Sequence, residues 1–219
     1  MTAEHPKPWP ASATLILLSL AIPGAVAHAA DQPPPDKSAE APVVRVLVAY
    51  HSRRGNTEKM AQGVVEGARK VPRVAVTLKK VEDVTKEDLQ GAHGIVLGAP
   101  TYYANIPGTM KTAIDDWAWK MKVDFTDKVG GAFATGGDQT GGKEHVVVSL
   151  LLLMINNRMV VAGPLQQGKD PDDIWAEIGA SAATGPTDPG VGDDDLDAAR
   201  RLGRQIARLA KKLHGRAAP

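Results

Sequence analysis

The sequence predicts an α/β protein, a three-layer, doubly wound domain built around a five-stranded parallel sheet. Short continuous apolar runs, typical of strands buried on both faces, alternate with longer amphipathic segments typical of helices. The charges are balanced, with 26 Lys and Arg against 25 Asp and Glu, and 43% of the residues are hydrophobic. This composition excludes a disordered polyelectrolyte and gives no reason to expect nucleic acid as a partner.

The expected elements begin at Val43. Thr57 is placed to cap the first long helix, and Pro107 suits the first turn of another. We expect a long loop after Gly163-Pro164, with glycine and proline concentrated between Gly179 and Gly192. The patterns predict strands at Val43–Tyr50, Val74–Leu78, Gly94–Gly98, Val129–Thr135 and Met159–Ala162, and helices at Thr57–Lys70, Thr85–Gln90, Pro107–Met121, Lys143–Asn156 and from Asp194 past Lys212.

Residues 1–42 differ in composition from the rest of the chain. A polar start carrying Lys7 precedes an apolar run from Ala13 to Ile22, and small residues follow up to Ala29, a pattern typical of a secretory signal peptide. An uncleaved anchor, or a misassigned start that would leave the protein cytoplasmic, is the alternative to export into the periplasm. We therefore expect a cleaved signal peptide at 1–29, a Pro-rich linker at 30–42 and the folded domain at 43–214.

The chain contains no cysteine. This excludes disulfides, thiolate nucleophiles, Cys-ligated zinc and iron–sulfur clusters, and we expect no metal site. Redox chemistry would therefore depend on a bound cofactor.

In a doubly wound sheet, ligands bind beyond the carboxyl ends of the strands. The loop after the first expected strand combines hydroxyl and amide side chains with a helix start, where backbone N–H groups and the helix dipole favour an anion. It lacks the G-x-G-x-x-G pattern, so a single terminal phosphate is favoured over a pyrophosphate. The candidate phosphate-binding residues are Ser52, Arg53, Arg54, Gly55, Asn56 and Thr57.

The loop after the third strand brings two adjacent tyrosines to the same edge of the sheet. Flat aromatic side chains and backbone amides suit a planar heterocycle, although we expect one tyrosine of the two to pack in the core. The candidate residues of this loop are Pro100, Thr101, Tyr102, Tyr103, Ala104 and Asn105.

The loop after the fourth strand is rich in glycine, which lets the backbone approach a ligand closely. It nearly spells a nucleoside-triphosphate loop, but Glu144 stands where Ser or Thr must hold magnesium, which argues against an NTPase. The candidate ligand-binding residues are Thr135, Gly136, Gly137, Asp138, Gln139 and Thr140.

Together these segments resemble the flavodoxin-like fold family, and within it the WrbA-like NAD(P)H:quinone oxidoreductases. The resemblance runs through VLVAYHSRRGNTEKMA, GIVLGAPTYYANIPGTMKTAIDD and GGAFATGGDQTGGKEHVVVSLLLLMINNRMVVAG, and covers about residues 43–213. It implies strand order 2-1-3-4-5 and an FMN cofactor whose phosphate lies on Ser52–Thr57, with Pro100–Asn105 lining the flavin ring and Thr135–Thr140 contacting its polar edge and ribityl chain. Asn156 and Asn157 stand where the family commonly has histidines near the quinone, and Asn157 joins the candidate cofactor-binding residues on this ground.

The resemblance implies an FMN-dependent oxidoreductase that takes a hydride from NADH or NADPH through flavin N5 and passes it to a quinone or other small acceptor. The flavin carries the chemistry, so no catalytic side chain is assigned. The alternative is an exported flavodoxin-type electron carrier that binds FMN without nicotinamide-dependent turnover; a flavin-free binding protein ranks behind both. A formal net charge of +1 favours the enzyme, because such carriers tend to be strongly acidic. A homo-oligomer is a further possibility, because tetramers are usual in the family.

Overall fold

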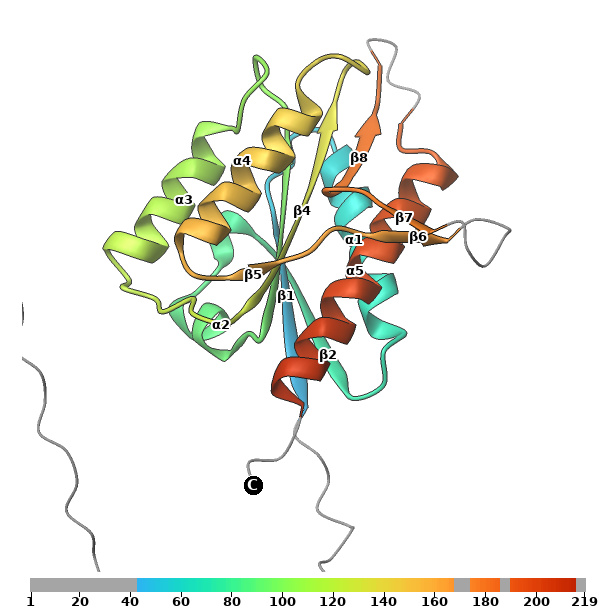
Figure 1. The fold of residues 1–219 in the computed structure, drawn as a ribbon. Helices are drawn as coiled ribbons and strands as arrows, with labels where there is room; N and C mark the ends of the chain where they lie inside the picture. The colour runs from blue at the N-terminus through green and yellow to red at the C-terminus, as the bar shows by residue number, and fades with distance from the viewer. Residues whose placement is uncertain (1–42, 168–173, 186–189, 216–219) are drawn as a thin grey trace, which may run out of the picture. The chain divides into compact units, whose positions relative to one another are not determined.

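The computed structural model describes residues 43–167, 174–185 and 190–215 (Figure 1). The signal peptide and the linker expected for residues 1–42 lie outside this range. The elements in chain order are β1 (Val44–Tyr50), α1 (Asn56–Arg69), β2 (Val74–Lys80), the 3-10 helix η1 (Val81–Asp83), α2 (Lys86–Gly91), β3 (Gly94–Pro100), α3 (Gly108–Trp119), β4 (Val129–Gly136), α4 (Lys143–Asn156), β5 (Val160–Val161), β6 (Leu165–Gln167), β7 (Ile174–Ala176), β8 (Ala180–Ala183) and α5 (Asp193–His214).

The strands form a parallel sheet in the order β2-β1-β3-β4-β5, which confirms the predicted doubly wound, flavodoxin-like fold. The central strands β3 and β4 are buried along almost their whole length. Strands of this kind carry apolar side chains on both faces, which is why they appear in the sequence as continuous apolar runs rather than as an alternating pattern.

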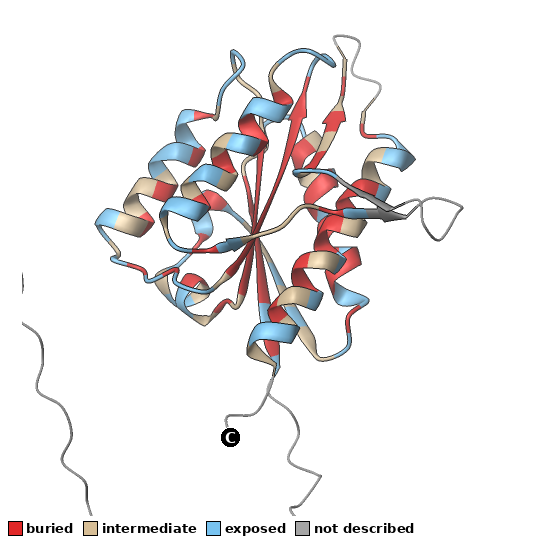
Figure 2. Cartoon of the chain, viewed as in Figure 1, coloured by how far each residue is buried: buried red, intermediate tan, exposed pale blue. Residues whose placement is uncertain are grey.

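Two hydrophobic cores lie on opposite faces of the sheet. In β1, Val46 and Val48 belong to the core shared with α1 and α5, whereas Leu47 and Ala49 belong to the core shared with α2, α3 and α4. The division follows from the two-residue period of a strand, which sends successive side chains to opposite faces. Figure 2 shows the buried residues concentrated along the central strands and the inner helix faces.

The fifth strand differs from the prediction. Instead of one strand at Met159–Ala162, the short β5 pairs with the first residues of β4, and β8 pairs with its second half, Phe133–Gly136. The segment expected to be a loop contains both β8 and the β6–β7 hairpin, so the main sheet has six strands rather than five. β8 consists of Ala-Ser-Ala-Ala, which has no strand propensity of its own, and pairing with the exposed edge of β4 makes it a strand.

Candidate functional site

A cleft of about 400 Å³ lies at the carboxyl edge of the sheet, within the usual size range of ligand sites. Its lining comes from the loops after β1, β3 and β4 and from the residues that follow β8. The structure thus brings together segments that are far apart in the chain. The lining residues are Ser52, Arg53, Arg54, Asn56, Thr57, Pro100, Thr101, Tyr102, Thr135, Gly136, Gly137, Thr184 and Gly185.

The loop after β1 leads into the start of α1. Gly55 precedes the helix in the left-handed conformation (φ 91°), and its N–H donates to the Ser52 hydroxyl at 3.1 Å. The N-cap residue is Gly55 and, in the described chain, no side chain caps α1, so Thr57, which lies inside the helix, is not the cap that the sequence predicted. Backbone N–H groups and the positive end of the helix dipole favour a phosphate at such a helix start.

A pair of buried threonine hydroxyls joins this loop to β4. Thr57 Oγ1 lies 2.8 Å from Thr135 Oγ1, and both residues are at most 3% exposed. The contact fixes the first turn of α1 against the end of the central strand. At the neighbouring end of β1, burial and then a hydrogen bond donated to the Glu58 carboxylate raise the pKa of Tyr50 to about 12. That bond holds the one acidic side chain of the first turn of α1.

The loop after β3 forms a tight turn. The N–H groups of Tyr102 and Asn105 each donate to the other's carbonyl oxygen at 3.0 Å, and Tyr103 and Ala104 at the tip have positive φ (50° and 61°). Tyr103 is fully exposed and Tyr102 lines the cleft, so neither tyrosine packs in the buried core and the expectation that one would is wrong. The reason is the turn itself, which projects beyond the sheet edge.

Two hydroxyl groups of this loop are buried without a partner. Thr101 Oγ1 and Tyr102 Oη have no hydrogen-bond partner in the described part of the chain. Leaving such groups unpaired costs about 1–3 kcal/mol each, and both residues line the cleft. A ligand with polar atoms at its ring edge would satisfy them, so these residues fit a flavin.

The His51 ring packs against the Tyr102 ring. The two rings meet edge to face, with centroids 6.3 Å apart and planes at 88°. His51 Nδ1 lies 3.0 Å from the Glu82 carboxylate, which orients the imidazole. Tyr102 is therefore held in position by an oriented ring that does not itself line the cleft.

The glycine-rich loop after β4 contributes unequally to the cleft. Thr135, Gly136 and Gly137 line it, whereas Asp138, Gln139 and Thr140 are exposed and do not line it. The Asp138 carboxylate accepts hydrogen bonds from the backbone N–H of Thr140 at 3.0 Å and from its hydroxyl at 3.2 Å, and these bonds lower the pKa of Asp138. The candidate residues of the three loops that do not line the cleft are Gly55, Tyr103, Ala104, Asn105, Asp138, Gln139 and Thr140.

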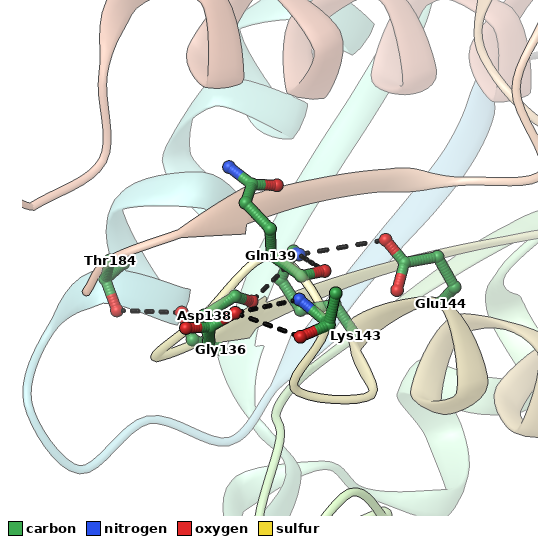
Figure 3. A network of polar contacts seen from close by, with 7 residues as sticks. Gly136, Asp138, Gln139, Lys143, Glu144 and Thr184 are labelled. Atoms are coloured by element: carbon green, nitrogen blue, oxygen red, sulfur yellow. Dashed lines mark hydrogen bonds and ion pairs between the residues drawn. The ribbon is translucent and has the colours of Figure 1, made fainter. Parts of the chain in front are cut away.

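Sequence reasoning missed Thr184 and Gly185, which follow β8 and complete the lining. The N–H and the hydroxyl of Thr184 both donate to the Gly136 carbonyl oxygen, at 2.8 and 3.2 Å (Figure 3). The threonine thereby fixes one wall of the cleft against another. No local pattern predicted this role, because it depends on the pairing of β8 with β4.

Asn157 does not reach the cleft. Its side-chain N–H donates to the Leu153 carbonyl oxygen at 2.7 Å, and the residue borders a small apolar hollow beside Trp117 and Phe125. Helix α4 starts near the carboxyl end of β4 and runs back along the sheet, which puts Asn157 at the opposite edge. The assignment of Asn157 to cofactor binding is therefore not supported within one chain.

Across the described residues, no three His, Cys, Asp or Glu side chains gather into a group that could hold a metal ion. No helix in that part of the chain is long and apolar enough to cross a membrane. The parallel sheet of order 2-1-3-4-5 and the cleft at its carboxyl edge define a flavodoxin-like protein.

Comparisons with known proteins agree with this class. The model of the family described as "NADPH-dependent FMN reductase" matches residues 42–168 of this chain. A flavodoxin of Aquifex aeolicus (strain VF5) is 35% identical over 164 residues, which are 74% of this chain and 85% of that protein. An NAD(P)H dehydrogenase (quinone) of Geotalea uraniireducens (strain Rf4) is 29% identical over 78% of this chain and 99% of its own length.

The solved structure of a WrbA-like flavodoxin from Agrobacterium tumefaciens has a TM-score of 0.60 at 24% identity, over 78% of this chain and 99% of that one, a likeness that shows the fold. The chain belongs to the NADPH-dependent FMN reductase family, and so to the flavodoxin-like, FMN-binding oxidoreductases.

Proposed function

We propose that this protein is an FMN-dependent NAD(P)H oxidoreductase whose physiological acceptor is a quinone or a similar small molecule. The observation that carries the proposal is the cleft itself. It joins an uncapped helix start, suited to a phosphate, to two buried hydroxyl groups that lack partners in the described chain. When bound there, FMN would supply the two-electron redox chemistry, accepting a hydride at N5.

The residues around the cleft divide into two groups in this proposal. Ser52 and Thr57 would donate hydroxyl hydrogen bonds to the phosphate, and the first-turn N–H groups of α1 would stabilise its charge. Arg53 and Arg54 also line the cleft and add positive charge at the same end. Thr101 and Tyr102, at the other end, would bind the polar edge and the face of the ring.

Support for an enzyme comes from the family description, which names NADPH as the donor, and from the relative named as a quinone dehydrogenase. The balanced charge of the chain fits an enzyme better than a carrier that docks on basic redox partners. An electron carrier is the second candidate function, because the 35% identical relative is called a flavodoxin. Export, which the N-terminal sequence predicts, stays a proposal, and the family resemblance leaves a homo-oligomer open.

The two functions differ in their response to a nicotinamide. The full-length protein, saturated with FMN and kept free of oxygen, is mixed with NADPH or NADH, and the flavin absorbance near 450 nm is followed. For a reductase we expect rapid bleaching by at least one nicotinamide and recovery after benzoquinone is added. Bound flavin that resists both nicotinamides and is bleached only by dithionite would instead establish a carrier.

A further inference from the structure

Lys143, the first residue of α4, is buried. Its side chain is 2% exposed, and among the described residues it is the one charged side chain in the buried class. The ammonium group donates to the carbonyl oxygens of Asp138 and Gln139, at 3.1 and 2.9 Å, and lies 3.7 Å from the exposed Glu144 carboxylate (Figure 3). This lysine therefore satisfies main-chain acceptors of the turn that precedes its own helix.

The contacts explain why the sequence of this loop only resembles a nucleoside-triphosphate loop. In such a loop the lysine reaches the phosphates of the ligand. Here Lys143 turns back onto its own loop, and it is absent from the lining of the cleft. Its ammonium group binds carbonyl oxygens of the loop itself. The proposed function therefore assigns no role to this buried charge.

The stem of Lys143 packs against the cleft wall. A Cβ atom added at Gly136 would lie 2.7 Å from Lys143 Cγ and 3.4 Å from the unpartnered Thr101 Oγ1. The lysine stem and the threonine hydroxyl therefore both lie next to the Cα of Gly136, which lines the cleft.

The turn closed by the lysine also rests on the aromatic loop. A Cβ atom added at Gly142 would lie 2.8 Å from Ala104 Cα, so the two loops are in direct main-chain contact. Ala104 follows Tyr103 in the tight turn after β3. The position of the segment from Gly136 to Gly142 therefore influences both loops that would surround a flavin ring.

We propose that Lys143 is a positioning residue for the flavin site: its two hydrogen bonds close the turn and hold Gly136 and Gly137 in the shape that lines the cleft. The expected effect on the flavin rests on the proposed function, that is, on FMN binding in the cleft. The rigidity of the turn does not depend on FMN. Charge-assisted hydrogen bonds to carbonyl oxygens are among the stronger ones in proteins, so their loss should loosen the loop.

Three variants of the full-length protein test the proposal. Lys143→Met keeps the stem and removes both hydrogen bonds. Lys143→Gln is one bond shorter and uncharged, but its amide offers two N–H donors to the same carbonyl oxygens. Glu144→Gln is the matched control, because it removes the neighbouring ion pair and leaves the two carbonyl contacts intact. Thermal unfolding of each variant shows which of them fold.

Backbone order parameters for residues 137–142, measured by NMR without FMN, give the first readout. We expect about 0.85 in the wild-type protein and in Glu144→Gln, and below about 0.6 in Lys143→Met. Values already below about 0.6 in the wild-type protein would overturn the proposal without reference to any variant. That result would be decisive even if Lys143→Met failed to fold.

FMN affinity, measured by quenching of flavin fluorescence, gives the second readout. We expect the dissociation constant to rise about tenfold in Lys143→Met and to stay within about threefold of wild type in Lys143→Gln and Glu144→Gln. Unchanged affinity in Lys143→Met, or no recovery in Lys143→Gln, would overturn the positioning role. Absence of FMN binding in the wild-type protein would instead refute the proposed function, while the order parameters would still test the turn.

Discussion

At the scale of single residues, the polar groups around the cleft differ in whether they have a hydrogen-bond partner within the described chain. Thr57 and Thr135 satisfy each other, whereas Thr101 Oγ1 and Tyr102 Oη are buried with no partner in the described chain. An unpaired buried hydroxyl is a cost to the free protein, and a bound polar ligand removes that cost. Thr101 and Tyr102 are therefore the cleft residues whose hydroxyl groups would gain most from a polar ligand.

Thr101→Val should therefore affect stability and binding in opposite directions. Removing an unpaired hydroxyl is expected to stabilise the flavin-free protein by about 1 kcal/mol and to raise the FMN dissociation constant about tenfold. Thr135→Val is the matched control. It leaves the Thr57 hydroxyl unpaired and should destabilise the flavin-free protein by about 1 kcal/mol. Urea unfolding and flavin titration measure the two effects, and a destabilised Thr101→Val would contradict the assignment.

At the scale of elements, α1 and α5 pack closely on one face of the sheet (Figure 1). Gly67 and Gly203 make the contact possible, because a Cβ at either position would lie 1.9 Å from a main-chain oxygen of the opposite helix. The amphipathic patterns of both helices were evident in the sequence. Their close approach was not, since it depends on which glycines meet after folding.

Gly203→Ala should force α1 and α5 apart. The added methyl group would overlap the Val64 carbonyl oxygen, and backbone cannot move aside as a flexible side chain can. We expect a loss of about 2–3 kcal/mol in the free energy of unfolding, measured in urea. Gly192→Ala is the control, because a Cβ there meets only the Asp195 side chain at 3.5 Å. Equal stability of the two variants would contradict the close packing.

The start of β3 and the end of α5 are joined by a histidine pair. The rings of His93 and His214 lie 5.2 Å apart, and the His93 ring accepts the Arg45 N–H at 3.0 Å. Burial, and then the positive charges of His214, Arg45 and Lys128, lower the pKa of His93. A histidine with a lowered pKa stabilises the fold above its unfolded-state pKa of about 6.5 and loses that contribution as the pH falls.

Acidification from pH 7.5 to 5.5 should therefore reduce the free energy of unfolding. Histidine side chains titrate within this pH range, whereas carboxyl groups titrate near pH 4 or below. His93→Asn retains a side-chain acceptor for the Arg45 N–H and cannot titrate, so its stability should vary less over the same window. Urea midpoints at the two pH values measure the effect. A variant with the wild-type pH dependence would rule out His93 as the source.

At the scale of the whole molecule, the buried strands and both cores follow from apolar runs that the sequence shows directly, whereas the strand order was implied by the family resemblance. The loops after β1, β3 and β4 were predictable as site segments, because parallel strands end at one edge. Thr184 and Gly185 were not predictable, because β8 is defined by long-range pairing with β4. Asn157 was assigned from the family motif alone, although the expected helix at Lys143–Asn156 already placed it at the C-terminal end of that helix, away from the edge that forms the cleft.

The central claim is that the cleft at the carboxyl edge binds FMN through its phosphate at the start of α1. The most direct test is to titrate the flavin-free, full-length protein with FMN and, separately, with riboflavin, which lacks the phosphate. We predict one FMN bound per chain and an affinity for riboflavin lower by at least about tenfold, since a phosphate at a helix start makes charge-assisted hydrogen bonds. Equal affinities for the two flavins, or binding of neither, would contradict the account.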